Sequence, residues 1–292
     1  MDETSSSAME ITGEIIRRSI HTFLKYFDYF STTPVMLLLP FSVSALLSSE
    51  ALFQPYFSFS FHFLGSSAAS GFISVLSVNF FVIPFAVSSF LIAKASVIEA
   101  LNHHKPSVPP PFFSVVSNYG PLILTYLCNL VLIFAINTII FTLFFFHLNY
   151  LKAFGLFLLP GARIFFYSFL GNTVFISNFA LIVAGMEHSR KGYAAIFKAC
   201  ALRKGKISMA LLLSLSTNLG LAAIEALFRY RVLRTYNFLG GFTTSVVLEG
   251  ILIAYLYSLI VVLDTIACCL FYKNCCESSD SENESAQRCD VV

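Results

Sequence analysis

The sequence predicts an all-α, polytopic membrane bundle of about six transmembrane helices, with amphipathic helices on its cytosolic surface. Two observations predict this class. The 292 residues are 57% hydrophobic and only 12% charged, whereas soluble domains are about 45–50% apolar and about 25% charged. The apolar residues also form long blocks, and a block of about 18 or more such residues has the length that a bilayer core requires. We therefore expect lipid to surround much of the chain.

Six apolar blocks can each carry a span: residues 34–53, 71–93, 120–146, 164–186, 207–228 and 244–271. The fourth block is the least clear, because the apolar stretch before it is short and Pro160-Gly161 interrupts the approach, as in a re-entrant segment. The first block contains Pro40, which predicts a kink, and is interrupted by Ser48-Ser49-Glu50. The alternative count is five spans.

The distribution of Lys and Arg predicts the orientation of the membrane domain, residues 34–271. With the N-terminus inside, 13 of these residues lie on the cytosolic side and 5 on the far side, which is the asymmetry that the positive-inside rule describes. We expect residues 1–33 to form a cytosolic N-terminus with an amphipathic helix, and residues 272–292 to form a disordered acidic cytosolic tail. The membrane is expected to be one of the endomembrane system, the endoplasmic reticulum or a later compartment.

Three stretches on the cytosolic side have the pattern of helices that lie on a membrane surface, and each precedes a pair of spans. The first has an apolar stripe of Ile16, Ile20, Phe23, Phe27 and Phe30. The second is residues 96–101. The third predicts that Tyr193, Ile196, Phe197 and Cys200 face lipid, with Lys198 and Arg203 directed to phosphate.

Three acidic residues fall inside or at the ends of predicted spans: Glu225, Glu249 and Asp264. Such groups are costly in a bilayer and are candidates for a functional site. Each also has a structural explanation, because Glu225 can pair with Arg229 four residues on, Glu249 with Arg231 or Arg234, and Asp264 with polar groups at the cytosolic side. Glu249 and Asp264 would lie about 22 Å apart on one helix, which argues against one shared site.

Two groups of residues are candidates for covalent modification. Cys268, Cys269, Cys275 and Cys276 are expected where the last span meets the cytosol, which is typical of palmitoylated cysteines; alternatively, small polarizable residues simply suit a helix end. Ser279 and Ser281 each have a Glu three residues on, as acidophilic kinases prefer. Phosphorylation would add about −1.5 to −2 charges per site. An unmodified tail is the alternative.

No motif points to catalysis, to a metal or to a cofactor. His103-His104 lacks a third ligand at metal-binding spacing, Gly65-Ser66-Ser67 has no associated base, and no phosphate-binding glycine loop occurs. The net charge of +2 and the placement of the cations between the blocks do not indicate a nucleic acid partner. The expected partners are the lipid bilayer and other membrane proteins.

The chain resembles a family of uncharacterised plant multi-span transmembrane proteins and, more distantly, the membrane domain beside some bacterial glycerophosphodiester phosphodiesterases. The resemblance rests on residues 14–34 (EIIRRSIHTFLKYFDYFSTTP), 185–207 (GMEHSRKGYAAIFKACALRKGKI) and 255–276 (YLYSLIVVLDTIACCLFYKNCC). It implies the fold and membrane residence. Because the activity of the bacterial relatives belongs to a separate domain, the resemblance implies no catalytic residue here.

The function that the sequence favours is non-enzymatic, as a membrane scaffold or partner-binding protein. The alternative is a small-solute or ion transporter or channel, and an intramembrane enzyme comes third. We expect no charged group near the middle of the last span, and this absence favours the scaffold.

Overall fold

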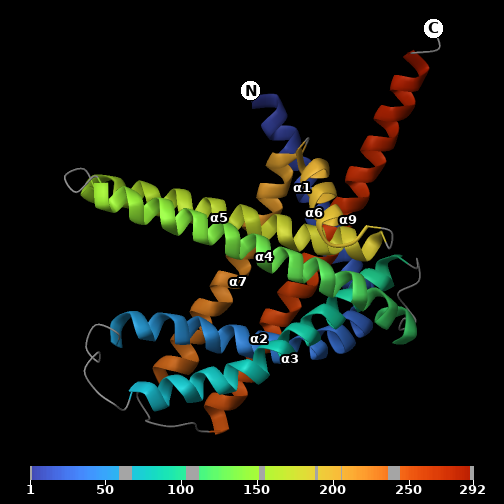
Figure 1. The fold of residues 1–292 in the computed structure, drawn as a ribbon. Coiled ribbons are helices and arrows are strands. Elements are labelled where there is room, and N and C mark those ends of the chain that lie inside the picture. The colour runs from blue at the N-terminus through green and yellow to red at the C-terminus, as the bar shows by residue number, and fades with distance from the viewer. Residues whose placement is uncertain are drawn as a thin grey trace. The chain divides into compact units, whose positions relative to one another are not determined.

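A computed structural model describes the backbone of residues 2–58, 68–102, 112–150, 155–187, 190–204, 206–235 and 244–289 (Figure 1). Side chains are described for residues 9–47, 82–102, 114–140, 142–143, 171–187, 190–204, 206–235 and 244–277. Over these parts the chain is helical and no strand is present, so the predicted all-α class is confirmed. The elements are α1 (Asp2–Lys25), α2 (Phe27–Ser58), α3 (Ala68–Asn102), α4 (Phe112–Tyr150), α5 (Gly155–Met186), α6 (Tyr193–Lys204), α7 (Ile207–Phe228), the π-helical turn η1 (Arg229–Leu233) and α9 (Thr244–Cys289).

Among the residues whose side chains are described, five helical segments are long and apolar enough to cross a membrane, and each overlaps one of the six predicted blocks. These segments are Phe27–Leu47, Val82–Asn102, Ser114–Ile140, Ile207–Leu233 and Thr244–Glu277. The described side chains of the uncertain fourth block, Gly171–Met186, form a shorter apolar helix. Its backbone nevertheless belongs to α5, which at 32 residues exceeds the roughly 20 residues that a span needs.

Several predicted breaks and boundaries are wrong. Helix α5 runs through Pro160-Gly161 without a break, although Pro160, as its sixth residue, removes one backbone hydrogen bond of the helix. Helix α2 begins at Phe27, within the predicted N-terminal region, and continues through residues 48–50 to Ser58. The kink predicted at Pro40 stays a prediction. Helix α9 continues to Cys289, where we predicted a disordered tail. No glycine or proline follows Gly250 in α9, so no residue of the tail interrupts the helical hydrogen bonds.

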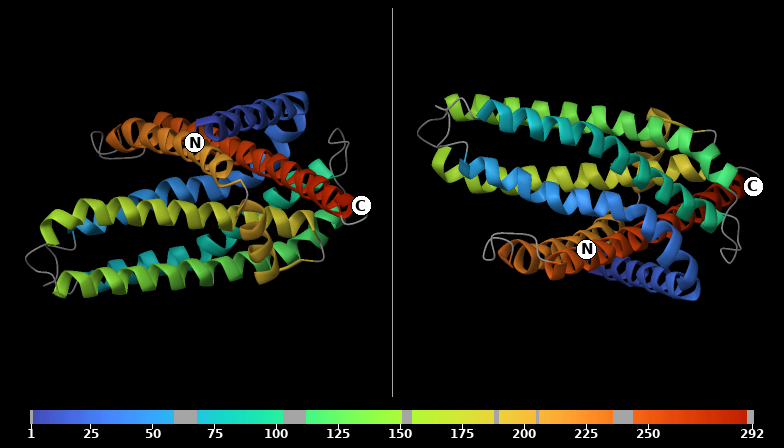
Figure 2. Two further views of the ribbon diagram at one scale, coloured as in Figure 1. Left: turned by 90° about the horizontal axis from the view of Figure 1, so that it is seen from above. Right: turned by 90° about the horizontal axis from the view of Figure 1, so that it is seen from below.

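The structure divides into two compact units, and each is described by itself. The first unit consists of Met1–Ile15, Val116–Ser214 and Cys268–Val292. Within it, α4 and α5 run side by side (Figures 1 and 2), and the Asn129 side chain on α4 donates a hydrogen bond to the Ser177 carbonyl on α5 at 2.9 Å. Phe179 of α5 contacts the rings of Phe271 and Tyr272 on α9, at centroid distances of 5.3 and 6.4 Å.

The second unit consists of Ile16–Val115 and Leu215–Ala267. Helices α2 and α3 pack along each other (Figure 2), with the rings of Phe41 and Phe90 4.5 Å apart. The buried hydroxyls of Ser42 and Ser258 form a hydrogen bond of 2.7 Å between α2 and α9. Polar side chains in an apolar bundle commonly form such interhelical contacts.

Large apolar side chains remain exposed along α4, as expected for a helix that faces lipid. Leu127, Val131 and Phe134 follow at steps of four and three residues and are 52%, 61% and 75% exposed. In water this stripe would be an unusual apolar surface. In a bilayer it requires no covering protein, because lipid tails are as apolar as the side chains.

Two of the three predicted surface helices differ from the prediction in their placement. The first predicted stripe assumed one helix as far as Phe30, but the chain turns at Tyr26 and begins a new helix. As a result Ile20 and Phe27 are exposed, while Phe23 and Phe30 are buried. Residues 96–101 are the buried end of α3 and do not form a separate surface helix.

Candidate functional site

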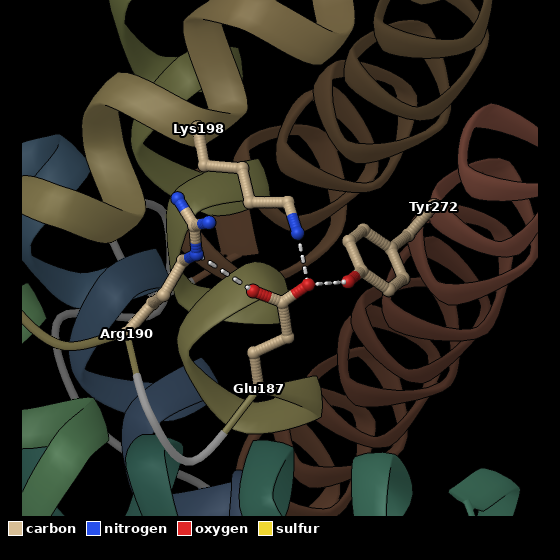
Figure 3. A network of polar contacts seen from close by, with 4 residues as sticks. All are labelled: Glu187, Arg190, Lys198 and Tyr272. Carbon is tan, nitrogen blue, oxygen red and sulfur yellow. Dashed lines mark hydrogen bonds and ion pairs between the residues drawn. The ribbon is translucent and has the colours of Figure 1, made fainter. Parts of the chain in front are cut away.

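A cluster of four polar side chains connects three elements of the first unit, and we call it the Glu187 cluster: Glu187, Arg190, Lys198 and Tyr272 (Figure 3). Glu187 lies immediately after the end of α5, and its amide donates a hydrogen bond of 2.9 Å to the Val183 carbonyl, which extends the helical pattern by one residue. The carboxylate is thereby fixed at the end of an apolar helix. Its position lets it meet side chains from both α6 and α9.

Three donors surround this carboxylate. The Lys198 ammonium of α6 donates a hydrogen bond to Oε1 and forms an ion pair with it. The Tyr272 hydroxyl of α9 donates to the same oxygen at 2.6 Å, and Arg190 Nε lies 3.2 Å from Oε2. Hydrogen bonds to ionised groups are stronger than neutral ones. The cluster therefore fastens α6 to the end of α5 and to α9.

The electrostatics of the cluster favour the ionised carboxylate. Burial raises the pKa of Glu187, but the hydrogen bonds from Lys198 and Tyr272 and the positive charges of Lys198 and Arg190 outweigh it, so that the pKa is below its usual value. A carboxylate held in this way is a poor general base at neutral pH, since a base works best with a pKa near the working pH. The arrangement is suited to holding helices together.

The turn that leads into α6 depends on Gly192. Its φ of +59° lies in the left-handed region that favours glycine, and a Cβ there would lie 3.3 Å from Cys128 Sγ. The Gly192 amide donates to the Thr125 hydroxyl of α4 at 3.0 Å, and its carbonyl accepts from the Ile196 amide. Helix α6 is thus held at its beginning by α4 and in its middle by Glu187.

The other end of α6 is also fixed. Lys206, which follows the helix, donates hydrogen bonds to the Asn274 carbonyl and Asn274 Oδ1 of α9 at 3.1 and 2.9 Å. The face of α6 toward the protein consists of Ala195, Ile196 and Ala199, which are 0%, 7% and 1% exposed. Small side chains allow close packing of helices.

The prediction for α6 is wrong at two residues, because Ile196 faces inward and Lys198 binds Glu187. Arg203 is buried at 8% exposure, and its predicted contact with phosphate stays a prediction. The prediction emphasised large apolar residues and ignored the two alanines, which define the buried face. Tyr193, Phe197 and Cys200 are exposed. Burial lowers the pKa of the Arg203 guanidinium, although Cys200 opposes the shift.

The acidic residues predicted inside spans all lie in the second unit. Glu225 on α7 and Glu249 and Asp264 on α9 are partly buried. Their predicted pairing with arginines, and the capping role of Asp264, stay predictions. The predicted separation of about 22 Å between Glu249 and Asp264 requires that both residues lie on one helix. Both lie on the uninterrupted helix α9.

The candidate modification sites lie in the C-terminal half of α9. Cys268, Cys269 and Cys275 are buried, and Cys276 is partly exposed. The backbone places Ser279 and Ser281 in α9, but their side chains are outside the described residues. His103-His104 and Gly65-Ser66-Ser67 also lie outside them. Among the described side chains, no group of three potential metal ligands occurs.

Sequence reasoning missed Glu187 and two buried charges, Lys94 and Glu99. Glu187 could have been noticed as the sole carboxylate among the six cations of residues 187–206. Lys94 and Glu99 are 2% and 3% exposed on α3 in the second unit, and Glu99 accepts a hydrogen bond from Ser114. We had placed both residues outside the second span, but the candidate span Val82–Asn102 contains them.

The described residues thus form an all-α protein with helices long and apolar enough to cross a membrane, in which a charged cluster fixes the short helix α6 between two apolar helices. Residues 111–287 match the family described as domain of unknown function (DUF8558). Because this match covers more than half of the chain, the protein belongs to that family, and the Glu187 cluster lies within the matched residues. Comparisons with curated proteins and with solved structures give no match.

Proposed function

We propose that this protein is a non-enzymatic membrane scaffold that binds other membrane proteins. The observation that carries the proposal is the Glu187 cluster, in which the charged groups hold α5, α6 and α9 together. Ser42 with Ser258, Asn129 with Ser177 and Lys206 with Asn274 are likewise engaged between helices. Such use of polar groups favours a rigid platform over a reaction centre.

The proposal includes residence in the endomembrane system with both termini in the cytosol, which the distribution of Lys and Arg supports. It also includes kinship with the plant membrane proteins and with the membrane domain beside the bacterial phosphodiesterases. Neither kinship brings a catalytic residue to this chain.

Proximity labelling from a tagged copy in native cells tests the scaffold. We expect a reproducible set of labelled membrane proteins that is depleted when Glu187→Gln loosens α6, at equal protein abundance. Arg190→Gln is the matched control, because Arg190 is an exposed member of the same cluster. An unchanged set of neighbours in Glu187→Gln would contradict a role for this platform.

A transporter is the second candidate, and buried Lys94 and Glu99 favour it. Ionisable groups inside membrane spans often mark pathways for ions or substrates. Purified protein in liposomes tests this candidate by solute or ion flux. The scaffold predicts no flux, and Glu249→Gln and Asp264→Asn should then change folding or abundance only. Transporter would become the leading function if flux is observed and is lost in any one of four variants that stay folded: Lys94→Met, Glu99→Gln, Glu249→Gln or Asp264→Asn.

A further inference from the structure

Helix α6 is confined to one membrane surface by its place in the chain. It lies between α5, which ends at Met186, and α7, which begins at Ile207. Its 12 residues span about 18 Å, too short to cross a bilayer core of about 30 Å. Because the apolar helices on both sides are membrane-directed, α6 stays at the level where they leave the bilayer.

The side of α6 that faces away from the protein carries a regular stripe, which we call the outer face: Tyr193, Phe197, Cys200 and Lys204. These residues follow at steps of four, three and four, so they lie on one side of the helix. Tyr193 is 54% exposed and Phe197 is 76% exposed, and Cys200 and Lys204 are also exposed. An exposed Phe beside a Tyr is typical of the interfacial region of a membrane.

The charge around this face is positive. Arg190, Lys191 and Lys204 are exposed, while the sole carboxylate of residues 187–206, Glu187, is occupied by Lys198 and Tyr272. A basic flank beside an apolar stripe complements an anionic leaflet, where each Lys or Arg near the surface contributes about 1 kcal/mol to binding.

Arg203 provides an independent indication of an anion. It lies at the border between the two faces of α6, about 40° from buried Ala199 and about 60° from exposed Cys200 at about 100° per residue. Its guanidinium Nε is buried and has no hydrogen-bond partner within the part of the chain that the structure describes. A buried charged donor without an acceptor is costly, and a lipid phosphate at the edge of α6 would supply one.

We propose that the outer face of α6 docks into the headgroup layer of an anionic leaflet, with Tyr193 and Phe197 at the upper acyl carbons and Lys204 and Arg203 on lipid phosphate. The occupant is thus the lipid of the protein's own membrane. This lipid site goes beyond the proposed scaffold function and does not depend on it, because it requires only membrane residence.

A single tryptophan tests the docking, since the natural chain has none. The full chain with Phe197→Trp is reconstituted into phosphatidylcholine vesicles containing phosphatidylglycerol, and its fluorescence is quenched with brominated lipids or with acrylamide. We expect strong quenching by bromine at shallow acyl positions and weak quenching by acrylamide. Phe134→Trp, on the exposed stripe of α4, is the control for deep lipid contact, and Glu10→Trp, at an exposed polar position of α1, is the control for water.

Acrylamide quenching of Phe197→Trp as strong as that of Glu10→Trp, without quenching by brominated lipid, would overturn the proposal and leave the face to a protein partner. The phosphate contact is tested in the same background by the ratio of quenching by brominated phosphatidylglycerol to that by brominated phosphatidylcholine. We expect anionic selectivity that falls about fivefold in Lys204→Gln and also falls in Arg203→Gln. Selectivity unchanged in both variants would refute the phosphate contact. Competition by inorganic phosphate would identify a free anion site and refute the lipid site.

Discussion

Glu187 is the residue on which the position of α6 depends most. The carboxylate takes hydrogen bonds from Lys198 and Tyr272, whose side chains come from two other helices, whereas its contact with Arg190 is within one turn and is half exposed. Contacts between elements stabilise the tertiary structure more than an exposed local pair, because exposed ion pairs are screened by water. The residues of the cluster should therefore differ in importance.

The first prediction concerns Glu187→Gln. Loss of the charge removes the ion pair with Lys198 and weakens two hydrogen bonds, so we expect a loss of about 1–3 kcal/mol of stability, the range for hydrogen bonds to charged groups. Arg190→Gln should cost less than about 0.5 kcal/mol. Unfolding in detergent, followed by circular dichroism, measures both. Equal losses in the two variants would show that the Lys198 and Tyr272 contacts carry no special weight.

The second prediction concerns pH. The pKa of Glu187 in the folded protein is below its ordinary value of 4.5, so the carboxylate stabilises the fold fully above that pH. This contribution is lost as the pH falls through the folded-state pKa. The difference in unfolding midpoint between the natural protein and Glu187→Gln should be constant near neutral pH and disappear in acid. A difference that persists at pH values well below 4.5 would contradict this assignment.

At the scale of elements, the turn before α6 sets the direction in which the helix starts. Gly192→Ala should destabilise this turn by about 1–3 kcal/mol, because a left-handed φ is strained for alanine and the added Cβ lies 3.3 Å from Cys128 Sγ. Tryptic cleavage at Arg190 and Lys191 should accelerate. Gly120→Ala is the control, since a Cβ there meets no atom within 4 Å, and cleavage should stay unchanged.

The contact of α2 with α9 permits a quantitative test. The buried hydroxyls of Ser42 and Ser258 are 2.7 Å apart, and Ser258 can also donate to the Ala254 carbonyl at 3.0 Å. Because Ser258 has this local alternative, the coupling between Ser42→Ala and Ser258→Ala should be modest, about 0.6 kcal/mol. A double-mutant cycle on detergent unfolding measures it, and strict additivity would exclude the interhelical bond.

At the scale of the whole molecule, the proposed orientation rests on the uneven distribution of Lys and Arg between the two predicted sides of the membrane. Asn283-Glu284-Ser285 is a glycosylation sequon, and with the tail in the cytosol it should carry no glycan. Digestion with an endoglycosidase should leave the mobility of the native protein unchanged. A shift that is abolished in Asn283→Gln would place the C-terminus in the lumen.

The sequence by itself determined the helical membrane class and the positions of five candidate spans. These depend on composition and on the length of apolar blocks, which are local properties. Only the tertiary structure decided which residues of α6 face inward, because Ala195 and Ala199 become informative when a neighbouring helix packs against them. It also decided the partners of Glu187, since Tyr272 is 85 positions away, and the burial of Lys94 and Glu99. Periodicity fixes which side chains share a face, whereas contacts distant in sequence fix what covers that face.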